Sequence, residues 1–351
     1  MNIKEQNVIV EIAVISDDGF IVPSVVMLTS AKFNKLPSSK YRIHFFSVGL
    51  NAFWQRKLLE LSSDDFEIII YETDTEKYKE VGISIHVTPT TFLKIDLAQL
   101  LPNVDKVLHI DGDALVFQDL TELYSEELND TPLGVVNSMY LDRSGYIKNV
   151  VGVEKGFNAG IMLMNLKEWR KTNASAQLTS MLLSAPKQWI YLEQDCMSAY
   201  FYGNLKYLHP RNNCCFYVWK DNYAIEELNE YYAMDYSCYE AFTDDAVILH
   251  LAGTPGRRPW QVVNGVYADV WQMYYNFSPL KHLHLERKDF VNDLLLESYP
   301  VLLIKYRFAK IMSKLCWGKQ REKYQSRQKQ LYVHIRRCRD MMSTLDYRSK
   351  S

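Results

Sequence analysis

The chain has 351 residues, of which 48% are hydrophobic and 23% are charged, and its formal net charge at pH 7 is −2. This length suits one large α/β domain with an appendage, or two domains, and the apolar content supports a sizeable core. No segment approaches the roughly 18 consecutive apolar residues of a membrane span. The six cysteines show neither a C-x-x-C pair nor the spacing of a disulfide framework.

The N-terminal residues 1–7 are polar and lead directly into an apolar stretch, without the pattern of a signal peptide. Reduced thiols and a cytoplasmic location are therefore expected.

The first part of the chain alternates apolar strands with helices. In chain order the expected elements are a strand over 8–16, a helix over 23–31, a strand over 41–48, a helix over 51–61 and a strand over 66–71. This order predicts a parallel, doubly wound sheet. Ligands of such sheets bind beyond the carboxyl ends of the strands, where the first strand is followed by Asp17 and Asp18.

A pair of carboxylates interrupts the next apolar region. A helix over 91–101 precedes a short buried strand over 107–110, which is followed by Asp111, Gly112 and Asp113 and by a second apolar run over 114–117. Carboxylates at the end of a core strand are costly unless a partner compensates them. Hard divalent cations prefer such oxygen ligands, so a D-x-D in this setting indicates a metal site.

The second half adds further strands and helices. Strands are expected over 133–136, 157–165, 203–208 and 246–251, and helices over 167–183 and 196–201. His250 lies near the end of the last strand and is followed by a glycine-rich, basic loop over 253–260. Neither a G-x-G-x-x-G motif nor a Walker P-loop occurs, which argues against a dinucleotide-binding or P-loop protein.

The C-terminal region is basic, although the whole chain is nearly neutral. Residues 301–351 carry 14 Lys and Arg against three Asp and Glu, so the totals of 40 and 42 leave 26 basic and 39 acidic residues for 1–300. The segment 301–316 has the composition of an amphipathic helix at a membrane interface, and residues 301–339 are expected to contact an anionic membrane surface. The alternative is a helix that packs on the body with solvated lysines. Nucleic-acid binding is not expected, because the body is acidic and no recognition motif is present.

Four separated segments resemble one family, the retaining glycosyltransferases of family 8. They are the Asp-Asp pair after the first strand, the D-x-D segment with its flanks, the segment Phe-Asn-Ala-Gly-Ile-Met-Leu-Met-Asn over 157–165, and the His-x-x-Gly loop that ends in Pro-Trp. The resemblance covers roughly residues 8–262. It implies a GT-A fold, which is an α/β Rossmann-like mixed sheet flanked by helices. We expect this catalytic domain over 1–280, and the charge pattern predicts a helical, basic, membrane-associating C-terminal region over 281–351. The resemblance also implies a UDP-sugar donor and Mn²⁺, with Mg²⁺ as a possible substitute.

The resemblance assigns roles to individual residues. It implies that the metal ligands are Asp111, Asp113 and His250. The residues expected to contact the nucleotide or the donor sugar are Ile15, Asp17, Lys94, Asp111, Gly112, Asn158, Ala159, Gly160, Gly253 and Arg258, with Arg257 as an alternative to the last. The expected catalytic residues are Glu193, Gln194 and Asp195. Gln194 would lie beneath the anomeric carbon, and because a neutral amide is a poor nucleophile, front-face attack with Gln194 stabilising the oxocarbenium character is favoured. The carboxylates of Glu193 and Asp195 also suit the N-terminus of a helix.

Several positions depart from the family pattern. Lys94 stands where the family usually has Arg, and Glu193 where it has Asp. Gly19 replaces an Asn that often follows the Asp-Asp pair, and Asn137 and Ser138 occupy the place of a usual sugar-binding Asp. The His-x-x-Gly loop is two residues longer, with Arg258 in place of Lys. These departures surround the donor sugar and the acceptor rather than the metal.

The expected function is transfer of glucose or galactose from UDP-glucose or UDP-galactose to a glycan or glycolipid acceptor, with retention of configuration. The expected context is synthesis of lipopolysaccharide or another surface polysaccharide, by an enzyme peripheral to the cytoplasmic face of the inner membrane. Two alternatives stay open. One is a haloacid-dehalogenase-type phosphatase, which also uses D-x-D after a strand. The other is a catalytically inactive, glycosyltransferase-like scaffold.

Overall fold

A computed structural model of the chain describes residues 8–81, 88–215, 218, 222–252, 258–263, 267–287, 310 and 312. The chain divides into two compact units, residues 1–253 with 271–283 and residues 254–270 with 284–351. The boundary predicted between residues 280 and 281 stays a prediction, and the predicted amphipathic helix over 301–316 lies outside the described residues except for positions 310 and 312. Among the helices of the described residues, none combines the length and the apolar character needed to cross a membrane.

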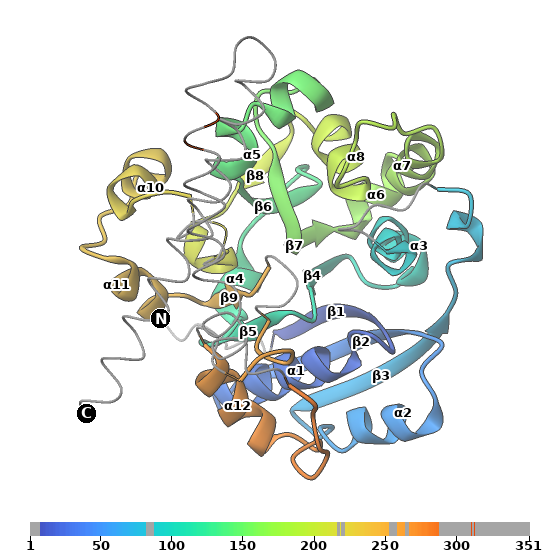
Figure 1. Cartoon of the computed structure of the whole chain (residues 1–351). Coiled ribbons are helices and arrows are strands. Elements are labelled where there is room, and N and C mark those ends of the chain that lie inside the picture. The colour runs from blue at the N-terminus through green and yellow to red at the C-terminus, as the bar shows by residue number, and fades with distance from the viewer. Residues whose placement is uncertain are drawn as a thin grey trace, which may run out of the picture. The chain divides into compact units, whose positions relative to one another are not determined.

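The first unit is built on a seven-stranded sheet (Figure 1). Its strands are β1 (Ile9–Asp17), β2 (Lys40–Val48), β3 (Phe66–Thr73), β4 (Lys106–Ile110), β6 (Leu133–Asn137), β7 (Phe157–Asn165) and β8 (Leu205–Tyr207). They lie in the order β3-β2-β1-β4-β7-β6-β8. A separate antiparallel pair is formed by β5 (Ala114–Val116) and β9 (Ile248–His250).

The direction of the strands differs between the two halves of the sheet. The ladders β3-β2, β2-β1 and β1-β4 are parallel, as the alternation of strands and helices predicted. The parallel prediction is wrong for the second half, because β7 lies between β4 and β6 and runs antiparallel to both. The result is the mixed sheet that the family resemblance implied.

Helices cover the sheet and carry much of the site. Within the described residues the α-helices are α1 (Ile21–Asn34), α2 (Ala52–Leu59), α3 (Leu97–Leu100), α4 (Thr121–Ser125), α5 (Met139–Arg143), α6 (Leu166–Lys171), α7 (Ala174–Leu183), α8 (Glu193–Tyr200), α10 (Ile225–Tyr232), α11 (Tyr239–Asp244) and α12 (Ala268–Phe277). The 3-10 helices are η1 (Glu76–Tyr78), η2 (Pro89–Asp96) and η4 (Pro210–Asn213), and η3 (Ile147–Val151) is a π-helical turn. The sequence patterns did not predict α4, α5, α10, α11 or α12, most of which are short.

Two predicted helices are built differently. The helix predicted over 167–183 is two helices, because Asn173 adopts φ +52° between α6 and α7, a left-handed conformation that asparagine tolerates better than most residues. The helix predicted over 91–101 is the 3-10 helix η2 followed by the single turn α3. The 3-10 segment begins with Pro89, which supplies no backbone N–H and suits the first turn.

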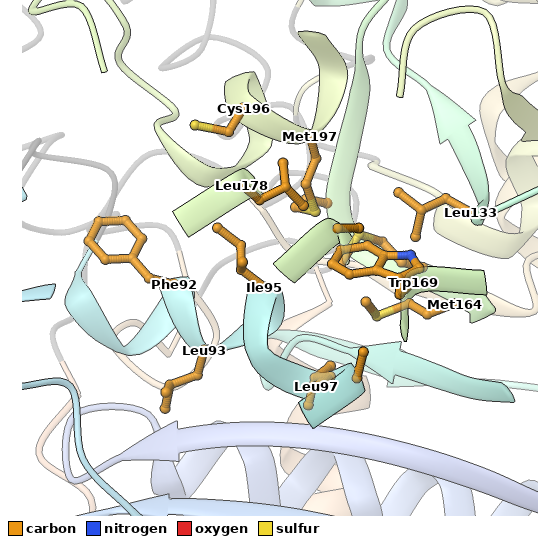
Figure 2. Close-up of a cluster of buried hydrophobic side chains, with 14 of the residues drawn as sticks. Phe92, Leu93, Ile95, Leu97, Leu133, Met164, Trp169, Leu178, Cys196 and Met197 are labelled. Atoms are coloured by element: carbon orange, nitrogen blue, oxygen red, sulfur yellow. The ribbon is translucent and has the colours of Figure 1, made fainter. Parts of the chain in front are cut away.

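A large hydrophobic cluster lies between the sheet and the helices α3, α6, α7 and α8 (Figure 2). Trp169 of α6 is completely buried in it and donates its indole N–H to the carbonyl oxygen of Pro132 at 3.1 Å. Cys196 and Met197 anchor α8 in the same cluster. Because these side chains fix α8, the residues of its first turn hold a defined position relative to the sheet.

The helix α1 lies beside β1 and β5 and is buried along most of its length, from Ile21 to Ala31. Its Ser24 closes the space around Gly112, where an added Cβ would fall 2.1 Å from the Ser24 Oγ. Gly112 therefore has a packing role against α1, which the sequence did not indicate. Asp111 and Asp113 are separated by a backbone with no room for a side chain.

Candidate metal and donor site

Three predicted ligands meet where β4, β5 and β9 come together. Asp111, Asp113 and His250 each present one ligand atom, and these atoms lie within 4.8 Å of one another. The His250 Nε2 lies 3.1 Å from the Asp113 Oδ1. His250 is brought there by the β5–β9 ladder, in which it pairs with Ala114, the residue after the D-x-D. Residues 137 positions apart in sequence thus form one cluster.

Backbone hydrogen bonds hold the D-x-D segment on both sides. The Asp111 N–H donates to the Gly160 carbonyl oxygen at 2.7 Å, and the Leu251 N–H donates to the Asp113 carbonyl oxygen at 2.8 Å. Gly160 of β7 lies directly against the imidazole, since an added Cβ would fall 2.1 Å from the His250 Cε1. The carboxylates and the imidazole are therefore fixed before any ligand binds.

A buried lysine compensates the first carboxylate. The Lys94 Nζ lies 2.9 Å from the Asp111 Oδ1 and 3.9 Å from the Glu193 Oε1, and it also donates to the Ala159 carbonyl oxygen at 3.3 Å. Burial by itself raises the pKa of Asp111, but the Lys94 ammonium and the neighbouring His109 hold this pKa well below its usual range. Burial raises the pKa of Glu193 to about 7, against the opposing effect of Lys94. The structure thus brings together two of the residues at which this chain departs from the pattern described above, Lys94 and Glu193.

Sequence reasoning missed His109. This residue is completely buried in β4, and its Nε2 lies 2.9 Å from the Asp111 Oδ1. Residues i and i+2 of a strand point to the same face. A histidine two positions before the first Asp was therefore a signal that the sequence contained.

The predicted donor-sugar residues lie on the next strand, β7. The Ala159 N–H donates to the Gln194 Oε1 at 3.0 Å, which ties the first turn of α8 to this strand. Asn158 accepts a hydrogen bond at its Oδ1 from the Gly160 N–H at 3.0 Å. The same oxygen accepts from the Asn213 Nδ2 at 3.0 Å, and the Asn213 Oδ1 lies 2.9 Å from the His250 Nδ1. Asn213 is a second site residue that the sequence reasoning missed, and no periodicity or motif around it marks it.

The first turn of α8 combines buried carboxylates with a strained backbone. Asp195 is completely buried, and its Oδ2 accepts hydrogen bonds from the Tyr146 hydroxyl at 2.6 Å and from the Tyr191 N–H at 2.9 Å. This is the structural role at a helix start that its position suggested. Leu192, just before the helix, has φ +37° and ψ −92°. Such a conformation costs about 1–3 kcal/mol and persists because the buried Leu192 side chain is held in the core.

Asp17 ends β1 at the same edge of the sheet at which β4 runs into the D-x-D. Its Oδ1 accepts from the Gly19 N–H at 3.0 Å and its Oδ2 from the Thr90 hydroxyl at 2.7 Å. Ile15 is half-buried two positions earlier and packs on the hydrophobic cluster. Both residues lie where the sequence placed them, and their contacts to a nucleotide stay predictions.

Two predicted donor-binding residues are not placed at the cluster. Gly253, like Arg257, lies outside the described residues. Arg258 belongs to the second compact unit, where its guanidinium carbon lies 5.6 Å from the centre of the Trp260 ring. The roles of these residues at the site stay predictions.

The three converging side chains fit a divalent cation. Two carboxylates and one imidazole converge, which is a mixed oxygen and nitrogen set that suits Mn²⁺ better than Mg²⁺. Lys94 already balances one of the two carboxylates, so a cation would meet a partly neutralised site rather than an isolated negative cluster. This arrangement can hold an ion that is shared with an anionic ligand, such as a diphosphate.

Comparison with known families agrees with this geometry. The sequence profile described as glycosyl transferase family 8 matches residues 11–263, which include the D-x-D, β7, the first turn of α8 and His250. The chain belongs to glycosyltransferase family 8. It is accordingly a glycosyltransferase, and the phosphatase alternative is not supported.

Curated relatives of this family 8 chain are distant. It is 25% identical over 230 residues to general stress protein A of Bacillus subtilis, a match that covers 64% of this chain and 78% of that protein. It is 25% identical over 276 residues to a lipopolysaccharide 1,2-glucosyltransferase of Escherichia coli, covering 76% of this chain and 78% of that protein.

Solved structures show the same fold. A structure of an active-site mutant of LgtC matches with a TM-score of 0.65 and 20% identity, and a structure of the galactosyltransferase LgtC with donor and acceptor sugar analogues matches with a TM-score of 0.61 and 21% identity. Each match covers 76% of this chain and 96% of the LgtC chain. At this identity the likeness shows that the two proteins share a fold.

Proposed function

We propose that this family 8 glycosyltransferase is metal-dependent and transfers a hexose, glucose or galactose, from a UDP-sugar to a glycan or glycolipid acceptor with retention of configuration. The observation that carries the proposal is the convergence of Asp111, Asp113 and His250 at the edge of a GT-A-like sheet. The activities named for its relatives, a lipopolysaccharide glucosyltransferase and a galactosyltransferase, support the class of donor and acceptor.

The three converging side chains would hold Mn²⁺, or Mg²⁺ in its place. The ion would supply Lewis-acid neutralisation of the charge that develops on the departing diphosphate. The chain's own residues fix the geometry beforehand, because Gly160 and Leu251 tie down the backbone of the two aspartates. A preorganised site of this kind costs little reorganisation during the reaction.

Lys94 would serve the donor in a second way. It is buried and carries its charge between Asp111 and Glu193. A point charge there can meet a phosphate oxygen or a sugar hydroxyl, although it lacks the bidentate fork of arginine. Binding of the ion to Asp111 would leave Lys94 less tightly held by that carboxylate and better able to contact the donor.

Gln194 would stabilise the reacting sugar rather than attack it. The Ala159 N–H holds its Oε1 at 3.0 Å, so the amide is fixed against the strand that carries Asn158 and Gly160. A fixed amide dipole can stabilise positive charge at the anomeric carbon. Glu193 and Asp195 flank it, and the buried hydrogen bonds of Asp195 to Tyr146 and Tyr191 support a role in holding the first turn of α8.

The basic C-terminal region supports a place at a membrane surface. Residues 301–351 carry 14 basic and three acidic residues, and such segments bind anionic lipid. We infer that residues 301–339 keep the enzyme at the cytoplasmic face of the inner membrane, where lipid-linked acceptors for surface polysaccharide lie.

The test is a panel of UDP-sugars with Mn²⁺, scored for release of UDP with and without a membrane extract as acceptor. We expect UDP-glucose or UDP-galactose to be consumed, and turnover to stop when the metal is removed by a chelator and to return with Mn²⁺. Asp113→Ala and His250→Ala should each abolish the Mn²⁺-dependent release of UDP.

Controls separate the site from the fold. Asp130→Ala removes an exposed carboxylate at a surface loop and should leave turnover unchanged. If Asp113→Ala retained normal turnover, the assignment of the metal site would be wrong. If no UDP-sugar were hydrolysed or transferred by the wild-type chain, an inactive scaffold would be the better description.

A further inference from the structure

We propose that Asn213 is a positioning residue for the metal site. It fixes the tautomer and ring orientation of His250, so that the Nε2 lone pair is directed to the cation between His250 and Asp113. The inference rests on the proposed function, because it takes Asp111, Asp113 and His250 to hold a divalent cation. None of the predicted roles involves Asn213, which lies at the end of η4 and far in sequence from each ligand.

One backbone N–H beside Asn158 has a fixed hydrogen-bond role. The Gly160 N–H can only donate, and it lies 3.0 Å from the Asn158 Oδ1. That atom must therefore be the amide oxygen, which accepts hydrogen bonds. The Asn213 side chain approaches the same oxygen at 3.0 Å, so it must present its NH₂ group there.

The orientation of Asn213 then decides the state of the histidine. With its NH₂ group on Asn158, Asn213 presents its oxygen to the His250 Nδ1 at 2.9 Å. An amide oxygen only accepts, so Nδ1 carries the hydrogen. The Asp113 carboxylate also only accepts, so without a cation Nε2 carries a hydrogen too and donates it to the Asp113 Oδ1 at 3.1 Å. A cation at this position would displace the Nε2 hydrogen while Nδ1 keeps its own, which leaves the Nε2 lone pair directed to the ion. The second ring nitrogen of a metal-binding histidine is commonly held in this way by a hydrogen-bond acceptor.

Burial makes the arrangement obligatory. Asn213 is completely buried and His250 is 2% exposed, so bulk solvent cannot replace the hydrogen bond. The backbone around both residues is also fixed, since the His250 N–H donates to the Cys214 carbonyl oxygen and the Cys214 N–H donates to the Ile248 carbonyl oxygen, each at 2.9 Å. The Cys215 thiol donates to the Asn213 Oδ1 at 3.4 Å, which further engages that oxygen as an acceptor.

The first experiment measures Mn²⁺ affinity directly, by electron paramagnetic resonance of the free ion, in the full chain without donor. Asn213→Leu removes both hydrogen bonds at similar side-chain volume, and we expect its Mn²⁺ affinity to fall about 10–100-fold. Asn213→Asp keeps an acceptor for Nδ1, and we expect its Mn²⁺ affinity to lie within about threefold of the wild-type affinity. Asn212→Ala, at the adjacent half-buried position, is the matched control and should match wild type.

The possible outcomes distinguish a failure of the proposed metal-dependent function from a failure of the role proposed for Asn213. If wild type itself does not bind Mn²⁺, the proposed function fails. If wild type binds Mn²⁺ and a folded Asn213→Leu variant binds it equally well, the role of Asn213 is overturned while the proposed function stands. Urea unfolding of each variant shows whether it is folded under the conditions of the titration.

A second experiment measures the wild-type chain itself, so its result does not depend on whether an Asn213 variant folds. Long-range ¹H–¹⁵N spectra of histidine-labelled protein, loaded with diamagnetic Mg²⁺, report which ring nitrogen of His250 carries the hydrogen. The His250→Gln variant identifies the signal. We expect the hydrogen on Nδ1. A hydrogen on Nε2 would overturn the proposal.

Discussion

Gly160 and His250 are in direct contact across the site, and the backbone of one leaves no space beside the ring of the other. A Cβ built at Gly160 would fall 2.1 Å from the His250 Cε1 and 2.9 Å from each ring nitrogen. Both residues are buried, and the ring is held by Asn213 and Asp113. The small residue in β7 is thus a condition for the imidazole to reach the aspartates.

This contact predicts that Gly160→Ala displaces His250. We expect Mn²⁺-dependent UDP release to fall at least about 100-fold, and the free energy of unfolding to fall by about 1–3 kcal/mol, because the added methyl group overpacks a buried ring. Steady-state turnover with a UDP-sugar and urea unfolding measure the two effects.

A matched glycine in the neighbouring strand provides the control. A Cβ at Gly134 of β6 meets only side-chain carbons, the nearest being the Leu128 Cδ2 at 3.1 Å. Gly134→Ala should cost some stability and keep full Mn²⁺ dependence. Normal turnover in Gly160→Ala would contradict the inferred contact.

The position of Lys94 predicts that bound metal reduces the loss of thermal stability when this lysine is replaced. In Lys94→Met the carboxylates of Asp111 and Glu193 lose their buried cationic partner, and loss of one partner of a buried pair costs on the order of 3 kcal/mol. Mn²⁺ on Asp111 would replace part of that charge. We therefore expect the loss in Tm to be smaller with saturating Mn²⁺ than with a chelator.

Lys94→Arg keeps the charge and should lose less stability than Lys94→Met under both conditions. Thermal unfolding followed by circular dichroism gives the four comparisons. An equal loss with and without Mn²⁺ would show that the ion does not take over charge compensation at Asp111.

The hydrogen bonds of Asp119, away from the metal site, predict that part of the stability is lost in acid. Asp119 follows β5, and its Oδ2 accepts from the Leu36 N–H at 2.8 Å and from the Tyr41 hydroxyl at 2.9 Å, while its Oδ1 accepts from the Thr121 N–H at 2.9 Å. Burial raises the pKa of Asp119, but the hydrogen bonds from Thr121, Leu36 and Ser39 outweigh it, so the folded-state pKa is lowered.

Because the pKa of Asp119 is lower in the folded chain, its carboxylate contributes its full stabilisation when the pH lies above the unfolded-state pKa of about 3.9. This contribution is lost as the pH falls through the folded-state pKa. We expect Asp119→Asn to lower the free energy of unfolding at pH 7 by about 1–3 kcal/mol, and to show a smaller further loss than wild type below about pH 4. Urea unfolding between pH 3 and pH 7 measures this, with the exposed Asp130→Asn as the control. Parallel pH profiles of Asp119→Asn and wild type would refute it.

The charge of the C-terminal region predicts salt-sensitive membrane binding. A chain without residues 301–351 should no longer sediment with anionic vesicles and should still release UDP from its donor, because the metal cluster lies in the first unit. The full chain should dissociate from the vesicles as salt rises, since exposed charges are screened. Continued sedimentation of the shortened chain would place the membrane contact elsewhere.

Sequence patterns were sufficient to predict the parallel half of the sheet and two of the three proposed metal ligands. The alternation of apolar strands and helices fixed the parallel half, because a buried strand needs a continuous apolar run and the chain must cross over between parallel neighbours. Asp111 and Asp113 could be chosen because carboxylates at the end of a core strand require compensation. His250, in contrast, was reached only through the family resemblance of the loop that follows it.

The tertiary structure alone decided which distant residues complete the site. The insertion of β7 between β4 and β6 brings Gly160 against His250, and the turn η4 places Asn213 behind the same ring. Lys94 and Glu193 are 99 positions apart in sequence, and only the packing of α8 against β7 and η2 brings them within 3.9 Å. Such contacts leave no periodic pattern, because hydrophobic periodicity records which face of an element is buried and not which element it meets. The sequence therefore specified the two aspartates in the turn between β4 and β5, and the fold specified the groups that orient and compensate them.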